Sequence, residues 1–524
     1  MPCPRGRSAL TLRRVVSLPP LLALDEVTGA SSAQLSARLE RGALGVEQAV
    51  QRCLTRIAEL DRAGPALRAV IELNPDALSI ARERDRERSQ GQPRGALHGL
   101  PILIKDNVDT GDRMLTSAGS LLLAKESAPR DAFIVERLRD AGAVLLGKTN
   151  LSEWANFRST HSTSGWSARG GLTRNPHVLD RNTSGSSSGT AAAIAAGFAP
   201  LGIGTETDGS ILSPAAVCGI VGLKPTLGLW SRSGIIPISA SQDTPGPMGR
   251  HVADVARLLG ALVGADPRDP ASTFSEHQAE RDYTRHLDHD GLVGARLGVP
   301  RNLAGFHPDV DRLLERAIEL LGAAGAVVID GLELPGAGKF DDAELEVLLH
   351  EFKAGMTAYL SSRSGPGVPS SLADLIVGNQ REAVREMPWF GQDLFERAQQ
   401  KPSLTDAGYR AARAHCLELA RTQGLDALLE RHRLQALIYP TNPPAWSVDL
   451  LNGDHILGGN TSFAAVAGYP SITVPMGATR GLPVGLSFTG PAWSEATLLR
   501  IAYAFEQQSQ ARIEPHFLPT LPEA

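Results

Sequence analysis

The chain has 524 residues, of which 42% are hydrophobic and 21% charged, as in ordinary globular proteins. The formal net charge is −5, so the chain lacks the excess of lysine and arginine that is typical of nucleic-acid-binding proteins, and no nucleic-acid partner is expected. The four cysteines lie far apart and form no CxxC pair or Cys/His cluster, which argues against zinc and iron–sulfur sites. We therefore expect neither a metal nor another cofactor.

The first 30 residues form a leader of uncertain role. Several arginines precede the apolar run 15–24, as in the first parts of a signal peptide. Against this, Pro19 and Pro20 interrupt the run, and Asp25-Glu26 follows without a small-residue cleavage site. A cytoplasmic location is favoured, and a periplasmic or secreted one stays open. No apolar stretch elsewhere is long enough to span a bilayer, so no membrane association is expected.

Helical and strand patterns alternate along most of the chain, which is typical of an α/β fold. The predicted helices cover residues 46–60, 81–90, 131–141, 190–196, 252–262, 307–321 and 498–507, and the predicted strands cover 69–73, 100–104, 143–146, 201–204, 326–329, 437–439 and 471–474. Turn signals dominate from Pro225 to Pro247. Because no linker stands out, we predict one large domain over residues 31–520, in which 334–433 form a more helical cap or insertion.

Two loops rich in serine and glycine lie in the stretch 181–225. Ser186 precedes the predicted helix 190–196, and Thr207-Asp208-Gly209-Ser210 follows the strand 201–204. Backbone N–H groups point outward unpaired at such helix starts. A serine there can be a nucleophile surrounded by hydrogen-bond donors, as acyl transfer requires.

A serine nucleophile needs a base, and Lys105 is a candidate because it closes the apolar strand 100–104. Its position alone also fits a charged strand end at the surface. Deprotonating a free lysine at pH 7 costs about 4.6 kcal/mol, and burial lowers that cost by disfavouring the charged form. Ser186 could then relay a proton from Ser210 to Lys105, while the N–H groups of residues 207–210 hold the oxyanion.

These motifs resemble the amidase signature family, whose members hydrolyse amides with a Ser–cisSer–Lys triad. The matching segments are Gly185-Ser186-Ser187-Ser188-Gly189, residues 204–211, residues 218–226, the Lys105-Asp106 strand end and residues 467–471, and the resemblance runs from about Ser32 to the C-terminus. It implies that Lys105 is the base, Ser186 the bridging cis-serine and Ser210 the nucleophile. It also implies a mixed, twisted β-sheet covered by helices on both faces.

The segments 150–159 and 164–171 resemble the bacterial peptide amidase branch of that family, which removes the C-terminal amide of peptides. Trp154, Trp166 and Ser187 are therefore candidate substrate-pocket residues, although the tryptophans also fit core packing and Ser187 a loop hydrogen bond. Asp208 and Ser188 stand where the family usually has glycine. A carboxylate at residue 208 would oppose a forming oxyanion unless it points away.

We expect a small amide or peptide amide as substrate and no obligatory protein partner. One alternative is the glutamine-hydrolysing subunit of a tRNA-dependent amidotransferase, which shares the triad but works inside a complex. A non-catalytic binding protein on the same fold is another, although all three triad positions are present. His98, His161 and His177 invite a Ser-His-Asp interpretation, but neither their spacing nor a G-x-S-x-G motif supports it.

Overall fold

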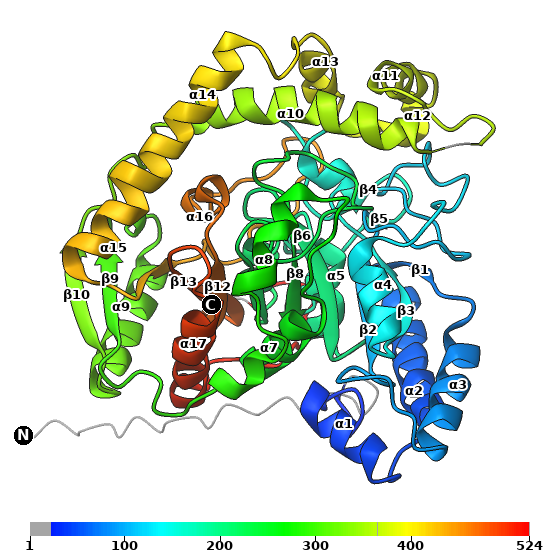
Figure 1. Cartoon of the computed structure of the whole chain (residues 1–524), viewed down its shortest axis with the longest axis horizontal. Coiled ribbons are helices and arrows are strands. Elements are labelled where there is room, and N and C mark those ends of the chain that lie inside the picture. The colour runs from blue at the N-terminus through cyan, green and yellow to red at the C-terminus, as the bar shows by residue number, and fades with distance from the viewer. Residues whose placement is uncertain (1–22, 364, 523–524) are drawn as a thin grey trace, which may run out of the picture.

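The computed structural model describes residues 23–522 with the exception of residue 364, so most of the predicted leader lies outside the described residues. An 11-stranded sheet forms the centre of the molecule (Figure 1). In spatial order its strands are β1 (Val70–Leu73), β3 (Val144–Thr149), β2 (Pro101–Lys105), β6 (Leu201–Glu206), β8 (Thr244–Gly249), β7 (Val221–Lys224), β12 (Ser471–Thr479), β13 (Leu482–Thr489), β11 (Ala436–Pro440), β9 (Arg296–Pro300) and β10 (Val327–Leu332). A separate two-stranded ribbon pairs β4 (Trp166–Ser167) with β5 (Gly171–Leu172).

The sheet is mixed, as the predicted fold class requires. β2 runs parallel to both β3 and β6, and β11, β9 and β10 form a second parallel group. The strands between them, from β6 through β8, β7, β12 and β13 to β11, pair antiparallel. The prediction of a single large α/β domain with a mixed sheet is therefore confirmed.

Helices cover both faces of the sheet. A Cβ atom at Gly202 would touch Ile194 of helix α5, whereas one at Gly249 would lie 3.5 Å from Val255 of helix α7. Gly249 pairs with Leu201, the neighbour of Gly202, and adjacent residues of a strand point to opposite faces. The helices around the sheet are α1 (Ser32–Glu40), α2 (Val46–Ile57), α3 (Ala77–Ser89), α4 (Phe133–Asp140), α5 (Ser188–Ala195), α6 (Leu212–Val217), α7 (Val252–Ala261), α8 (Ser275–Gln278), α9 (Pro308–Ala323), α16 (Ser462–Ala467) and α17 (Glu495–Ser509).

A further group of helices arches over one edge of the sheet in Figure 1. It comprises α10 (Asp341–Ser361), α11 (Leu372–Arg381), α12 (Ala383–Glu386), α13 (Asp393–Gln399), α14 (Ala407–Leu417) and α15 (Asp426–His432). The inner sides of α10, α11 and α13 pack with residues of the segments 118–157 and 236–238 in a second apolar cluster, which includes Phe352, Leu375 and Phe395. This region coincides with residues 334–433, for which the sequence predicts a helical cap or insertion.

Strand β8 differs from the sequence prediction, which gives only turns up to Pro247. Its sequence, TPGPMG, holds two prolines and two glycines, which are rare inside a sheet. β8 pairs with β6 along all six residues but with β7 only at Met248 and Gly249. Pro245 and Pro247 therefore lie where one side of the strand has no partner, and their missing N–H groups break no ladder on that side.

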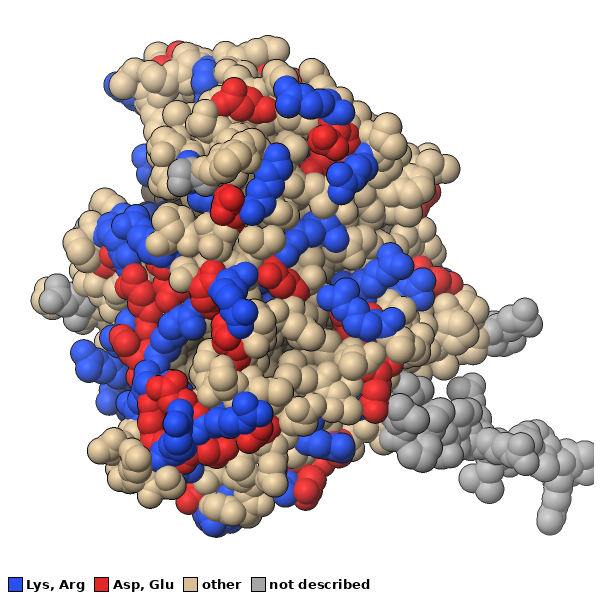
Figure 2. All heavy atoms as spheres, turned by 90° about the vertical axis from the view of Figure 1, so that its right-hand side faces the viewer, with Lys and Arg blue, Asp and Glu red and all other residues tan. Residues whose placement is uncertain are grey.

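The surface shows charges of both signs. On the face in Figure 2, lysines and arginines are interspersed with aspartates and glutamates, so no stripe of a single sign forms there. Within residues 23–522, apart from 364, no helix combines the length and the apolar composition that crossing a bilayer requires. The same part of the chain holds no group of three or more His, Cys, Asp or Glu side chains that could bind a metal ion.

Candidate active site

Lys105 is the last residue of β2, and its side chain is fully buried. Because β2 and β6 are parallel neighbours, their carboxyl ends lie at the same edge of the sheet. There the Lys105 Nζ lies 2.8 Å from the Ser186 Oγ, 2.9 Å from the Thr205 Oγ1 and 3.1 Å from the Thr205 carbonyl oxygen. The surface alternative for Lys105 is therefore excluded.

Ser186 lies in the loop that leads into α5, and the peptide bond between Gly185 and Ser186 is cis. The N–H of Ser187 donates to the carbonyl oxygen of Ser210 at 3.0 Å, which joins this loop to the second serine loop. The Ser187 hydroxyl donates to the Thr205 carbonyl oxygen at 3.1 Å, as expected for a loop hydrogen bond. The two serine loops and the end of β2 thus meet at one place.

The second serine loop, residues 207–210, connects β6 to the start of α6. The Glu206 carboxylate accepts the N–H groups of Ile211 at 2.7 Å and Leu212 at 2.9 Å, and so ties the two ends of the loop together. Gly209 has a φ of 77°, a conformation that glycine adopts without strain. Among the described residues, the N–H groups of 207–210 have no hydrogen-bond acceptor, which leaves four donors available for an anion.

Asp208 points away from this set of donors. Its two carboxylate oxygens accept the hydroxyls of Thr461 and Ser462, each at 2.6 Å. These residues stand at the start of α16, so the bonds anchor the loop to a helix about 250 positions further along the chain. The Asp208 carboxylate, which stands where the family usually has glycine, therefore has its own partners and does not face the N–H groups of residues 207–210.

The electrostatics around Lys105 favour a neutral amine. Complete burial lowers the pKa of Lys105 to about 7, against a smaller opposite effect of Asp243 and Glu206. Asp106, the next residue, is bound elsewhere: the Ser117 hydroxyl and the Gly119 N–H donate to its carboxylate, and Arg169 forms an ion pair with it at 3.1 Å. Asp106 is therefore paired away from Lys105.

Comparison with known proteins identifies the family of this fold and site. The sequence profile of the Amidase family matches residues 48–499 of the chain. The chain belongs to the Amidase family. Its members hydrolyse amide carbon–nitrogen bonds, and the chain is accordingly a hydrolase of this class.

Several relatives within the family have been described. The solved structure of the native peptide amidase from Stenotrophomonas maltophilia has 52% identity and a TM-score of 0.89, with 93% of this chain and 99% of that chain covered. A probable amidase of Arabidopsis thaliana is 41% identical, with 90% of this chain and 88% of the relative covered. The A subunit of the glutamyl-tRNA(Gln) amidotransferase of Symbiobacterium thermophilum is 35% identical, with 91% and 96% covered.

The three candidate pocket residues lie in packed positions in this member of the family. Trp154 is 2% exposed and packs edge-on against Phe395, with the ring centroids 5.5 Å apart. Trp166 is 6% exposed and packs edge-on against Phe390 at 5.3 Å. Neither tryptophan nor Ser187 lines the cavity of about 450 Å³ that opens beside Thr205 and Thr207. The structure therefore favours the packing and loop-hydrogen-bond alternatives over substrate contact.

Sequence reasoning missed the residues that line this cavity. Asn107 and Thr205 connect it to Lys105, and part of its wall comes from α10, more than 200 positions away. The only signal for Asn107 is its place two residues after Lys105, and nothing in the sequence marks the helical region around α10 as part of a site. The three histidines take other roles: His98 and His177 are buried against the carbonyl oxygens of Arg84 and Cys218, and His161 contacts Thr160.

Proposed function

We propose that this amidase hydrolyses the C-terminal carboxamide of peptides and releases its nitrogen as ammonia, with Ser210 as nucleophile, Ser186 as proton bridge and Lys105 as base. The observation that carries the catalytic part is the 2.8 Å contact between the Lys105 Nζ and the Ser186 Oγ in a fully buried site. The substrate is suggested by the 52% identity to solved peptide amidases, one of them bound to the inhibitor chymostatin.

The three contacts of the Lys105 Nζ can be made by a neutral amine, the form that burial favours. A neutral amine has two N–H donors and one lone pair, whereas the ammonium form has three donors and no acceptor. The Thr205 carbonyl oxygen and hydroxyl oxygen can receive the two N–H groups, and the lone pair then faces the Ser186 hydroxyl. In this state Ser186 donates to Lys105 and can in turn accept a proton.

The reaction begins when the Ser210 Oγ attacks the carbonyl carbon of the amide. Its proton passes to Ser186 while the Ser186 proton passes to Lys105, so the lysine becomes an ammonium ion and no histidine is needed. The carbonyl oxygen becomes an oxyanion that the N–H groups of residues 207–210 can hold. Lys105 then returns a proton to Ser186 while the Ser186 proton passes to the amide nitrogen, and the C–N bond breaks. Ammonia leaves, and water hydrolyses the acyl-serine that remains.

The test is the release of ammonia from a C-terminal peptide amide, acetamide and free glutamine by the purified chain. The peptide amide should have the highest kcat/KM, because binding energy from remote groups can be used at the reacting centre. Ser210→Ala should remove turnover and leave the melting curve unchanged. A Ser210→Ala variant that keeps more than a few per cent of the activity would contradict the nucleophile. Acetamide or glutamine as the best substrate would contradict the proposed substrate class.

A glutamine-hydrolysing component of an amidotransferase is the second candidate, because relatives described as glutamyl-tRNA(Gln) amidotransferase A subunits share 33–36% identity with the chain. Such a protein works within a complex. Turnover of a peptide amide by the chain alone, with glutamine at least tenfold poorer, would separate the two candidates.

A further inference from the structure

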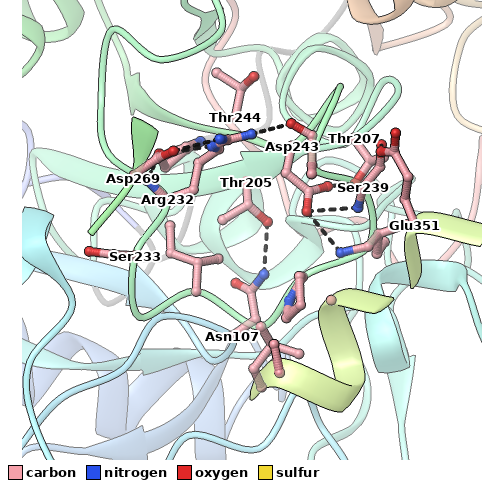
Figure 3. Close-up of a pocket in the computed structure, with 18 of the residues that line it drawn as sticks. Asn107, Thr205, Thr207, Arg232, Ser233, Ser239, Asp243, Thr244, Asp269 and Glu351 are labelled. Atoms are coloured by element: carbon pink, nitrogen blue, oxygen red, sulfur yellow. Dashed lines mark hydrogen bonds and ion pairs between the residues drawn. The ribbon is translucent and has the colours of Figure 1, made fainter. Parts of the chain in front are cut away.

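A cavity of about 450 Å³ lies beside the proposed catalytic residues. Asn107, Thr205 and Thr207 line it, and the Thr205 hydroxyl oxygen also accepts a hydrogen bond from the Lys105 Nζ. Its walls come from the segment 232–245 and from one side of helix α10 (Figure 3). The cavity therefore lies between the catalytic edge of the sheet and the helical region 334–433.

All five charged side chains that the described residues contribute to the wall are already bound within the protein. Arg232 and Asp269 form an ion pair with each other at 2.6 Å, and Arg268 pairs with Glu136 at 2.9 Å. Asp243 accepts a hydrogen bond from the Thr207 hydroxyl at 2.6 Å. Glu351 accepts hydrogen bonds from the hydroxyls of Ser239 at 2.6 Å and Tyr409 at 2.7 Å. A charged ligand group in this cavity would lose its hydration without gaining an unpaired partner, which is unfavourable.

The rest of the wall is mainly apolar and includes Ile235, Ile236, Ile238, Pro245, Ala358 and Leu404. One buried polar atom among the lining side chains has no partner within the described part of the chain, the Asn107 Oδ1. The amide nitrogen of Asn107 donates to the Thr205 Oγ1 at 3.0 Å, and Figure 3 shows the amide oxygen turned away from Thr205. A ligand that places apolar atoms here can also donate one hydrogen bond.

The size of the cavity decides which part of an amide it suits. Ammonia, the group released, has one heavy atom, whereas about 450 Å³ is the liquid volume of roughly 15 water molecules. We propose that the cavity binds a large apolar side chain on the acyl side of the scissile amide, and that α10 limits its size. This inference rests on the proposed function and adds a preference for leucine-sized and aromatic residues over charged ones.

The experiment measures kcat/KM for ammonia release from the N-acetyl amides of glycine, leucine, phenylalanine, aspartate and lysine. Burial of the side chain should raise kcat/KM for the phenylalanine amide about ten- to hundredfold over the glycine amide. The aspartate and lysine amides should not exceed the glycine amide. A flat series, or a charged residue at the top, would overturn this inference while leaving the proposed function intact. Failure to hydrolyse any amide would overturn both.

Two variants test whether the preference arises in this cavity. Ala358→Leu and Ala354→Leu each add atoms to the wall from α10, where leucine suits a helix almost as well as alanine. Each should lower the ratio of phenylalanine to glycine kcat/KM at least tenfold. The matched control is Thr357→Leu, at an exposed position of the same helix outside the wall, which should leave the ratio unchanged. An unchanged ratio in both wall variants, with melting curves like that of the wild type, would overturn the assignment.

Discussion

Lys105 and Lys148 lie on neighbouring parallel strands, and both side chains are fully buried. The Lys105 Nζ faces two hydroxyls and a carbonyl oxygen, and the carboxylates that influence it, Asp243 and Glu206, are bound to other groups. The Lys148 Nζ donates to the Val108 carbonyl oxygen at 2.6 Å and to the Thr116 hydroxyl at 2.9 Å.

Buried carboxylates lie near both lysines. Burial lowers the pKa of each lysine, and carboxylates act in the opposite direction on both: Asp243 and Glu206 on Lys105, and Asp106 and Asp109 on Lys148. Asp106 and Asp109 each also pair with an arginine, Arg169 and Arg363. Burial alone therefore does not make a lysine into a base. Lys105 differs because its Nζ contacts the Ser186 hydroxyl, whereas the Nζ of Lys148 contacts Val108 and Thr116, and four predictions test this contrast.

The largest effect is expected from Lys105→Arg. A guanidinium stays protonated and cannot accept the Ser186 proton, so kcat should fall about a thousandfold or more. Lys105→Ala should lose activity to a similar extent. Steady-state ammonia release, with a melting curve for each variant, measures both. A Lys105→Arg variant with a near-normal rate would show that only positive charge is needed, and the proton relay would have to be abandoned.

Lys148→Met should mainly affect stability. Removing the buried amine takes away the hydrogen bonds that its Nζ donates to the Val108 carbonyl oxygen and the Thr116 hydroxyl, which should lower the free energy of unfolding by about 1–3 kcal/mol. Urea unfolding measures this loss. The fraction that stays folded should retain its kcat, because the hydrogen bonds of the Lys148 Nζ go to Val108 and Thr116 and not to the serine loops. Loss of kcat without loss of stability would contradict the contrast between the two lysines.

Asp208→Gly should have an intermediate effect. The substitution restores the residue that the family usually has but removes two hydroxyl contacts to a carboxylate, which typically contribute about 1.5–3 kcal/mol each. If part of that energy holds residues 207–210 in place, kcat should fall about 10- to 100-fold. Thr461→Val removes one of the two contacts and should have a smaller effect in the same direction. Unchanged or faster turnover in both variants would show that the anchor is not needed.

The sequence predicts well that Lys105 and the two serine loops meet, because the determinants of this contact are local. The apolar strand before Lys105 and the serine loops beside residues 190–196 and 201–204 can be recognised from composition and motif. Contacts between distant segments leave no such signal: the bonds from Asp208 to Thr461 and Ser462 span more than 250 positions. Likewise, Trp154 and Trp166 occur in distinctive segments, but only tertiary packing decides that their rings lie in the core.

In strand β8, pairing with a neighbouring strand overrides the local preference of the sequence, so a prediction from local sequence is wrong there. The prolines and glycines of Thr244–Gly249 predict a turn, yet β6 offers six consecutive partners and the strand forms. This matters for the site, since β8 follows directly after Asp243, whose carboxylate accepts the Thr207 hydroxyl. The wall of the cavity thus depends on a strand that the sequence pattern alone does not predict.

The smallest effect expected is the dependence of kcat/KM on pH. Lys105 must be neutral to act, and burial lowers its pKa to about 7, so activity should rise as the pH increases through 7. About a tenth of the lysine is neutral at pH 6 and about nine tenths at pH 8, which predicts an increase of about tenfold between them. An unburied lysine would place this limb above pH 9 and a carboxylate base near pH 4, so either result would contradict the assignment. Lys148→Met should show the same limb as the wild type, because the proposed base is the amine on β2.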